Sequence, residues 1–179
     1  MKKLLYILPL LMLVVSCESK FQTWRELNED YMNSVPERLG KTDDMQPNPY
    51  VLRTGELTDG VLYEVYHDGY GATPKVGYNT ATGSANSAVF VKYQGWTVDG
   101  QQFDASSDTV TGAWFYMPEV VEGWQSALSQ MKEGSHWKIY LPSSCGYGGD
   151  GSEDGYGVFV IPPYSTLIFD IELIEVVNN

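Results

Sequence analysis

Apolar side chains between residues 19 and 40 recur every three or four positions, which places them on one face of a helix. These apolar residues are Phe21, Trp24, Leu27, Tyr31, Val35 and Leu39. The opposite face carries polar side chains, namely Arg25, Glu26, Asn28, Glu29 and Asp30. Pro36 is expected to end or kink the helix, because proline cannot continue the helical hydrogen-bond pattern. The pattern therefore predicts an amphipathic helix that docks on the rest of the chain or on a second copy.

Most of the remaining pattern alternates with the two-residue period of strands. Strands are expected at 51–53, 61–66, 89–93, 137–141 and 167–173. Asp99-Gly100 predicts a hairpin turn after the strand at 89–93, because these residue types tolerate positive φ. A second helix is predicted over 123–134, where the apolar residues are spaced three, four and seven apart and Gly134 suits a left-handed cap. One short helix lying across an antiparallel sheet is an α+β arrangement.

The first residues are typical of a secretory signal. Three residues with two lysines precede an apolar run over 4–15, and Ser16-Cys17 closes it. Residues 13–17 (LVVSC) resemble the lipobox of bacterial lipoproteins, and this resemblance implies that Cys17 is lipidated. We therefore expect a signal peptide at 1–16 and a lipidated segment with helix and linker at 17–49. A folded domain is expected at 50–179, in a lipid-anchored protein of a bacterial cell envelope, periplasmic or at the outer membrane.

Composition narrows the class of protein. The 179 residues carry a formal net charge of −12, which argues against a nucleic-acid surface or a polybasic membrane patch. Loss of residues 1–16 would remove two lysines and leave −14. If Cys17 carries lipid, Cys145 is the one remaining thiol and no intramolecular disulfide can form. Eighteen glycines and 13% aromatic residues suit a turn-rich, largely β domain.

Candidates for metal or nucleophilic chemistry are weak. Cys145 and His136 would make a thiol and a base, but a lone, partly buried thiol is the more common arrangement. The two histidines, His67 and His136, lack metal-ligand spacing. The acidic loop 150–155 begins like a calcium loop, but Ile161 stands where the twelfth position requires a glutamate. We expect neither a metal nor a cofactor.

Aromatic residues at turns and element ends form the stronger signal, and they are Tyr93, Phe103, Trp114, Phe115, Trp124, Tyr147 and Phe169. The residues between them resemble FKBP-type peptidyl-prolyl isomerases. Residues 89–95 (VFVKYQG) and 99–106 (DGQQFDAS) resemble that family's V-x-V-x-Y-x-G and D-G-x-x-F-D-S-S motifs. Residues 120–134 resemble V-I-x-G-W…L-x-x-M-x-x-G, residues 141–148 resemble I-P…A-Y-G, and residues 161–173 resemble I-P-P-x-x-x-L-x-F-x-V-E-L. The resemblance runs in order over about 57–176.

The resemblance implies a curved antiparallel sheet wrapped around one short helix, with an apolar cleft between them. By position, Trp124 would floor the cleft beneath a substrate proline, and Asp104 would orient the site. The Tyr147 hydroxyl and the Ile161 backbone N–H would donate hydrogen bonds to the peptide. The remaining lining residues would be Tyr93, Phe103, Val120, Val121, Phe169, Trp114 and Phe115. The implied partners are polypeptides with X-Pro bonds, the macrolide inhibitors of the family, and a membrane through the lipid anchor.

Three departures from the family pattern keep other functions open. Thr109 replaces a common basic residue, Ala113 stands where an aromatic can line the cleft, and the loop over 148–159 is long and acidic. The first reading is an isomerase that assists the folding of exported proteins. One alternative is a peptide-binding or chaperone module with the same cleft and little isomerase activity. Another is a structural envelope component whose cleft is filled by its own long loop.

Overall fold

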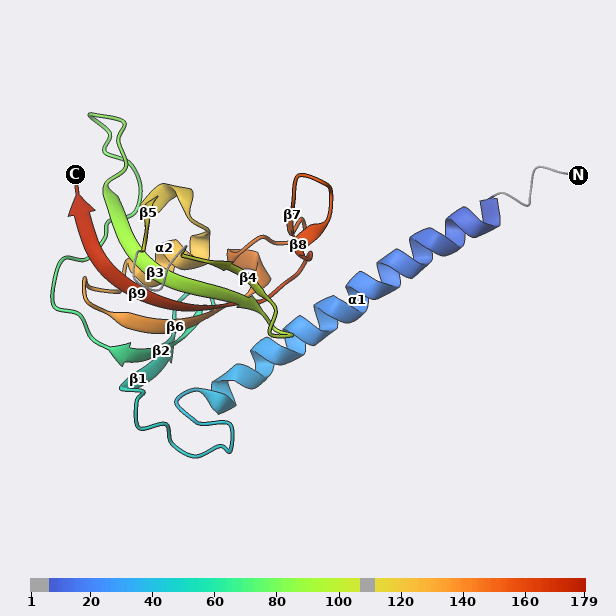
Figure 1. Cartoon of the computed structure of the whole chain (residues 1–179), viewed down its shortest axis with the longest axis horizontal. Coiled ribbons are helices and arrows are strands. Elements are labelled where there is room, and N and C mark those ends of the chain that lie inside the picture. Colours follow the sequence, from blue (N-terminus) through green and yellow to red (C-terminus); the bar gives the residue numbers. More distant parts are fainter. Residues whose placement is uncertain (1–6, 107–111) are drawn as a thin grey trace, which may run out of the picture.

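The computed structural model describes residues 7–106 and 112–179, with side chains from residue 20 onward. Its elements are α1 (Ile7–Arg38), β1 (Arg53–Glu56), β2 (Leu62–His67), β3 (Ser87–Thr97), β4 (Gln102–Ala105), β5 (Ala113–Tyr116), α2 (Glu122–Leu128), β6 (His136–Leu141), β7 (Ser152–Glu153), β8 (Phe159–Ile161) and β9 (Leu167–Asn178). The main sheet is antiparallel in the order β1-β2-β6-β9-β3-β4, β5 also pairs with β3, and β7 and β8 form a separate hairpin. Figure 1 shows this sheet curving around α2. The predicted α+β class is confirmed.

The two faces of the sheet pack against different helices, because successive residues on a strand point to opposite sides. Burial alternates along all eleven residues of β3. The face toward α2 holds the main core, whose fully buried members include Leu128, Met131, Ile139, Leu141, Ile171 and Leu173. On the other face, Leu62 and Tyr140 pack against Val35 of α1. The two helices therefore cover opposite faces of one sheet.

The second helix is shorter than its sequence pattern suggests. It ends at Leu128 with Ser129 as its C-cap, so the expected end at Gly134 is wrong. The N–H of Glu133 donates to the carbonyl of Ala72 at 2.8 Å instead of continuing the helix. Gly134 has a φ of +89°, but it turns the chain into β6 rather than capping α2. Met131 is buried, as the predicted spacing requires, although it lies beyond the end of the helix.

The helix expected over 19–40 is present as the last part of α1, and Pro36 lies inside it. Figure 1 shows the N-terminal half of α1 projecting away from the domain and its C-terminal half lying beside the sheet. One residue of its expected polar face is misplaced. Asn28 is 1% exposed, because its side chain accepts a hydrogen bond from Thr166 N–H at 2.7 Å. Along the described part of the chain, no helix is both long and apolar enough to cross a membrane.

The five expected strands overlap β1, β2, β3, β6 and β9, whereas β4, β5, β7 and β8 were not expected. The Asp99-Gly100 turn joins β3 to β4, with Gly100 at a φ of +83°. The Gly-, Asn-, Thr- and Ser-rich residues 77–88 predict an exposed insertion, but residues 87 and 88 begin β3. The rest of this segment is closed by an isolated bridge between Tyr78 and Ala85. The first strand starts at Arg53, two residues later than expected.

One ion pair on the outer face of the sheet predicts a pH-dependent stability. His136 Nε2 lies 2.7 Å from Asp170 Oδ1, Tyr66 stacks on the imidazole, and Glu172 pairs with His136 across β6 and β9. The hydrogen bond to Asp170 is the main cause that raises the pKa of His136 above its usual value. Stabilisation by the charged imidazole is therefore complete below pH ~6.5 and is lost as the pH rises through the raised pKa.

We expect the free energy of unfolding to fall between pH 6 and pH 8 by up to about 1 kcal/mol more in the wild type than in His136→Gln, because the pair is partly exposed. Urea unfolding at both pH values measures the difference. Equal pH slopes for the two proteins would contradict the assignment.

Candidate active site

A hollow of about 140 Å³ lies where the sheet, β5 and the start of α2 meet. Its lining residues are Tyr93, Phe103, Asp104, Phe115, Glu119, Val120, Val121, Trp124, Tyr147 and Phe169. All but Glu119 are residues that the sequence assigned to a substrate cleft. An apolar cavity of about 150 Å³ holds a benzene ring. The hollow therefore has room for one small ring.

The indole of Trp124 forms the centre of the lining. It is 4% exposed and meets three rings edge to face, with centroids 5.1 Å from Tyr93, 5.7 Å from Phe115 and 5.2 Å from Phe169. Such arrangements place ring edges against ring faces, as aromatic quadrupoles prefer. Its indole N–H has no hydrogen-bond partner among the residues that the structure describes. Trp124 thus contributes an apolar surface that its neighbours hold in one orientation.

Two glycines of the family-like motifs make this packing possible. A Cβ on Gly95 would lie 2.7 Å from the ring of Phe169 and 2.8 Å from the ring of Phe103. A Cβ on Gly123 would lie 2.5 Å from Leu141, so glycine lets α2 approach β6 closely. Any side chain at either position would displace the aromatic lining or the helix that carries Trp124.

Asp104 is the carboxylate at the rim. Its Oδ2 accepts a hydrogen bond from the Tyr93 hydroxyl at 2.9 Å, and its Oδ1 accepts one from the backbone N–H of Ala105 at 2.8 Å. Burial, and then the bond to Asp104, raise the pKa of Tyr93 well above its usual value. The phenol stays protonated at neutral pH, so it remains a donor that holds the carboxylate in place.

Tyr147 offers a hydroxyl at the same hollow. Tyr147 is 40% exposed, and its hydroxyl has no hydrogen-bond partner within residues 20–106 and 112–179. Burial and the nearby charge of Asp104 raise its pKa. A neutral phenol that lines a hollow in this way is able to donate a hydrogen bond to a bound carbonyl.

One aromatic side chain expected in the cleft, that of Trp114, is not among those that line it. Trp114 is 51% exposed and packs on Phe90, because it alternates on β5 with Phe115, whose ring faces Trp124. Because Trp114 points to the opposite side of β5 from Ala113, it does not replace the aromatic side chain that can line the cleft at position 113. The side chain of Ile161 is 3% exposed and belongs to the main core. The donor role expected of Ile161 belongs to its backbone N–H and stays a prediction. The sequence analysis in turn missed Glu119, which directly precedes Val120 and ends a short 3-10 helix.

The long loop leaves the hollow open. Residues 148–159 include β7 and the start of β8 and supply none of the lining residues. This overturns the idea of a cleft filled by its own loop. Thr109, the departure near Asp104, lies outside the described residues.

Thiol and metal chemistry find no support in the geometry. Cys145 is 6% exposed and its thiol bonds to the carbonyl of Asp59, whereas His136 is paired with Asp170 on the outer face of the sheet. Burial raises the pKa of the Cys145 thiol, so it is a poor nucleophile. Within the described part of the chain, no three His, Cys, Asp or Glu side chains gather in a way that would hold a metal ion.

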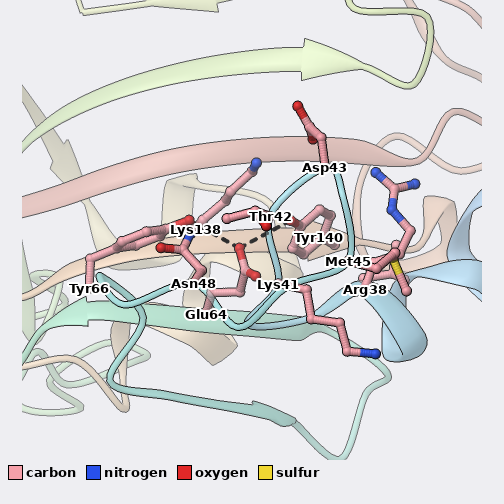
Figure 2. Close-up of a pocket in the computed structure, with 11 residues that line it drawn as sticks. Arg38, Lys41, Thr42, Asp43, Met45, Asn48, Glu64, Tyr66, Lys138 and Tyr140 are labelled. Carbon is pink, nitrogen blue, oxygen red and sulfur yellow. Dashed lines mark hydrogen bonds between the residues drawn. The ribbon is translucent and has the colours of Figure 1, made fainter.

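A polar hollow of about 440 Å³ lies on the other side of the sheet, between the end of α1 and strands β2 and β6 (Figure 2). Glu64 lies at its centre and is 4% exposed. It accepts hydrogen bonds from Gly40 N–H at 2.7 Å and from the hydroxyls of Tyr66 and Tyr140, both at 3.2 Å. Burial and the Glu64 charge raise the pKa of both tyrosines, which keeps them protonated. These bonds fasten the end of α1 to the sheet.

Residues 79–174 match the protein family described as FKBP-type peptidyl-prolyl cis-trans isomerase. The match covers more than half of the chain and includes every residue that lines the aromatic hollow. The chain belongs to this family.

Named relatives extend the comparison. The macrophage infectivity potentiator of Trypanosoma cruzi is 30% identical over 169 residues, which is 92% of this chain and 78% of that protein. The peptidyl-prolyl cis-trans isomerase Mip of Coxiella burnetii is 36% identical over 120 residues, or 67% of this chain. This chain spans only 46% of the length of that relative. The crystal structure of a peptidyl-prolyl cis-trans isomerase from Pseudomonas syringae pv. tomato superposes with a TM-score of 0.64 at 31% identity, covering 87% of this chain and 94% of that one.

Proposed function

We propose that this protein catalyses the cis/trans isomerisation of X-Pro peptide bonds in exported polypeptides of a bacterial cell envelope. The observation that carries the proposal is the small aromatic hollow around Trp124, with the Tyr147 hydroxyl in its lining. The hollow has the size for one proline ring, and the hydroxyl suits a substrate carbonyl. Membership of the isomerase family supports the same assignment.

The chemistry follows from the environment rather than from a reactive group. Rotation about the X-Pro bond crosses a barrier of about 18–20 kcal/mol, because it breaks amide resonance. The planar amide is more polar than the twisted one, so an apolar surface disfavours the ground state relative to the transition state. A donor such as Tyr147 then stabilises the twisted amide if its hydrogen bond is stronger there. No proton or electron pair leaves the substrate in this scheme.

We expect Tyr147→Phe to lower kcat/KM about two- to tenfold in a peptide isomerisation assay, the cost of one hydrogen bond of about 0.5–1.5 kcal/mol. The raised pKa of Tyr147 keeps the donor neutral, so the wild-type rate should stay flat from pH 6 to pH 9. Tyr156→Phe is the matched control, since Tyr156 is 94% exposed on the hairpin. A wild-type rate equal to the uncatalysed one would refute the proposed activity.

A chaperone role is the second candidate, and one surface favours it. A groove of about 860 Å³ lies between α1, the β3–β4 turn and β8. It exposes apolar side chains of Leu27, Val158 and Val160. Suppression of the aggregation of an unfolded protein, without isomerase activity in the same preparation, would favour this role over catalysis.

Anchoring through Cys17 is part of the proposal and rests on the lipobox-like residues 13–17. We expect Cys17→Ala to abolish incorporation of labelled fatty acid in a bacterial host and to move the protein from the membrane fraction to the soluble fraction. Cys145→Ala is the control, because a buried core thiol is not a lipidation site. Equal labelling of Cys17→Ala and the wild type would contradict the anchor.

Self-association through α1 also stays a prediction. The structure buries Val35 of its apolar face against the sheet, but Leu27 is 50% exposed. A second copy would therefore contact the Leu27 side of the helix. We expect sedimentation of residues 17–179 to give a dimer that Leu27→Glu dissociates and Gln22→Glu leaves intact. A wild-type protein that sediments as a monomer would contradict self-association through α1.

A further inference from the structure

Helix α1 contacts the segment that follows the β7–β8 hairpin. The indole N–H of Trp24 donates to Ser165 Oγ at 3.0 Å, and Ser165 Oγ donates to the carbonyl of Pro162 at 2.6 Å. One turn earlier, Phe21 meets Phe159 of β8 edge to face at 5.6 Å. Residues more than 130 positions apart in sequence are therefore joined at the side of the domain that α1 passes (Figure 1).

Asn28 adds to this contact, and its side-chain amide both accepts and donates a hydrogen bond. Its oxygen accepts from Thr166 N–H at 2.7 Å, its nitrogen donates to the carbonyl of Trp24 at 2.7 Å, and its backbone carbonyl accepts from the Thr166 hydroxyl at 3.3 Å. Asn28 and Thr166 are 1% and 2% exposed. Buried amides with full sets of partners hold two segments in one relative position.

Tyr164 connects this contact to the hollow. Its φ is +63°, a left-handed conformation that is costly for a bulky residue and persists only where the surroundings impose it. In this conformation its N–H donates to the carbonyl of Gly148 at 2.8 Å, and Gly148 directly follows Tyr147. The guanidinium of Arg25 lies 4.8 Å from the ring centroid of Tyr164. Contacts from α1 thus reach the residue next to Tyr147.

We propose that α1 is a positioning element of the isomerase site. Trp24 and Asn28 hold the segment 162–166 in place through their hydrogen bonds. The N–H of Tyr164 in that segment then holds Gly148, and this fixes the neighbouring Tyr147 hydroxyl at the hollow. The inference rests on the proposed function, since it assigns Tyr147 a role in binding the twisted amide. Trp24, Asn28 and Tyr164 are positioning residues in this scheme, because none of them lines the hollow.

The other end of α1 has an independent attachment, which makes the idea testable. Glu64 accepts a hydrogen bond from the N–H of Gly40, and Val35 packs on Leu62 and Tyr140. Loss of the contacts near Tyr164 should therefore leave the helix joined to the sheet. An effect on the site can then be separated from detachment of the helix.

The experiment compares Trp24→Phe/Asn28→Ala with Tyr140→Phe in the mature chain. The control also removes an internal hydrogen bond, but on the far face of the sheet. We expect the double variant to lower kcat at least twofold and by no more than Tyr147→Phe does, with KM within twofold, because a small displacement of a catalytic donor is costly. Tyr140→Phe should keep wild-type kinetics. Hydrogen exchange at the Tyr164 amide should speed up about tenfold in the double variant alone.

The double variant is also placed in a Tyr147→Phe background, where the proposal expects no further loss of kcat because both changes act through one hydroxyl. A further loss as large as in the wild-type background would overturn the proposal, and so would kinetics equal to those of Tyr140→Phe. If the double variant fails to fold by circular dichroism, Trp24→Phe alone is judged by the same criteria.

Failure of the proposed function gives a different result. A wild-type protein without isomerase activity would refute the function, and exchange at Tyr164 would then decide whether α1 holds this segment. Faster exchange in the variant would support the positioning contact, and unchanged exchange would overturn it.

Discussion

The edge-to-face packing of one indole with three other rings is the interaction on which the rest of the molecule depends. Trp124 comes from α2, and its partners Tyr93, Phe115 and Phe169 come from three different strands. The sheet must curve for these rings to converge on one helix, and Figure 1 shows that curvature around α2. Edge-to-face contacts leave one face of the assembly open as a small hollow, which a fully interdigitated core would have closed.

The chemistry of the site follows from that packing. A hollow walled by rings removes water from a bound amide, and its polar groups lie at the rim, where Asp104 is held by Tyr93 and Tyr147 keeps its proton. The structure thus separates an apolar floor from a donor at the edge. That division suits a reaction whose transition state is less polar than its ground state and needs orientation more than it needs a reactive side chain.

The alternation of the strands also explains why the N-terminal helix belongs to the same unit. Residues of β2, β6 and β9 that point away from α2 form the surface on which Val35 and its neighbours pack. Toward its N-terminus the helix also contacts the segment 162–166, which follows the β7–β8 hairpin. One face of the sheet carries the hollow. The other face carries α1, whose contacts with the segment 162–166 reach Gly148, the residue after Tyr147. The start of the linker after α1 is fastened to the sheet by the bond from Gly40 N–H to Glu64.

The sequence by itself determined the features that depend on neighbours a few residues away. Period-two and period-four patterns identify β3, β6, β9 and the buried face of α2, and the Asp99-Gly100 pair identifies a turn. Family-like motifs contain eight of the ten residues around the hollow, and the pattern of aromatic residues adds Phe115. Tertiary structure decided where α2 ends, since Ala72 takes the N–H of Glu133, and why Asn28 is buried, since Thr166 is its partner. It also decided that Trp114 faces away and that Ile161 lies in the core, because the pleat and the hairpin set these orientations through residues remote in sequence.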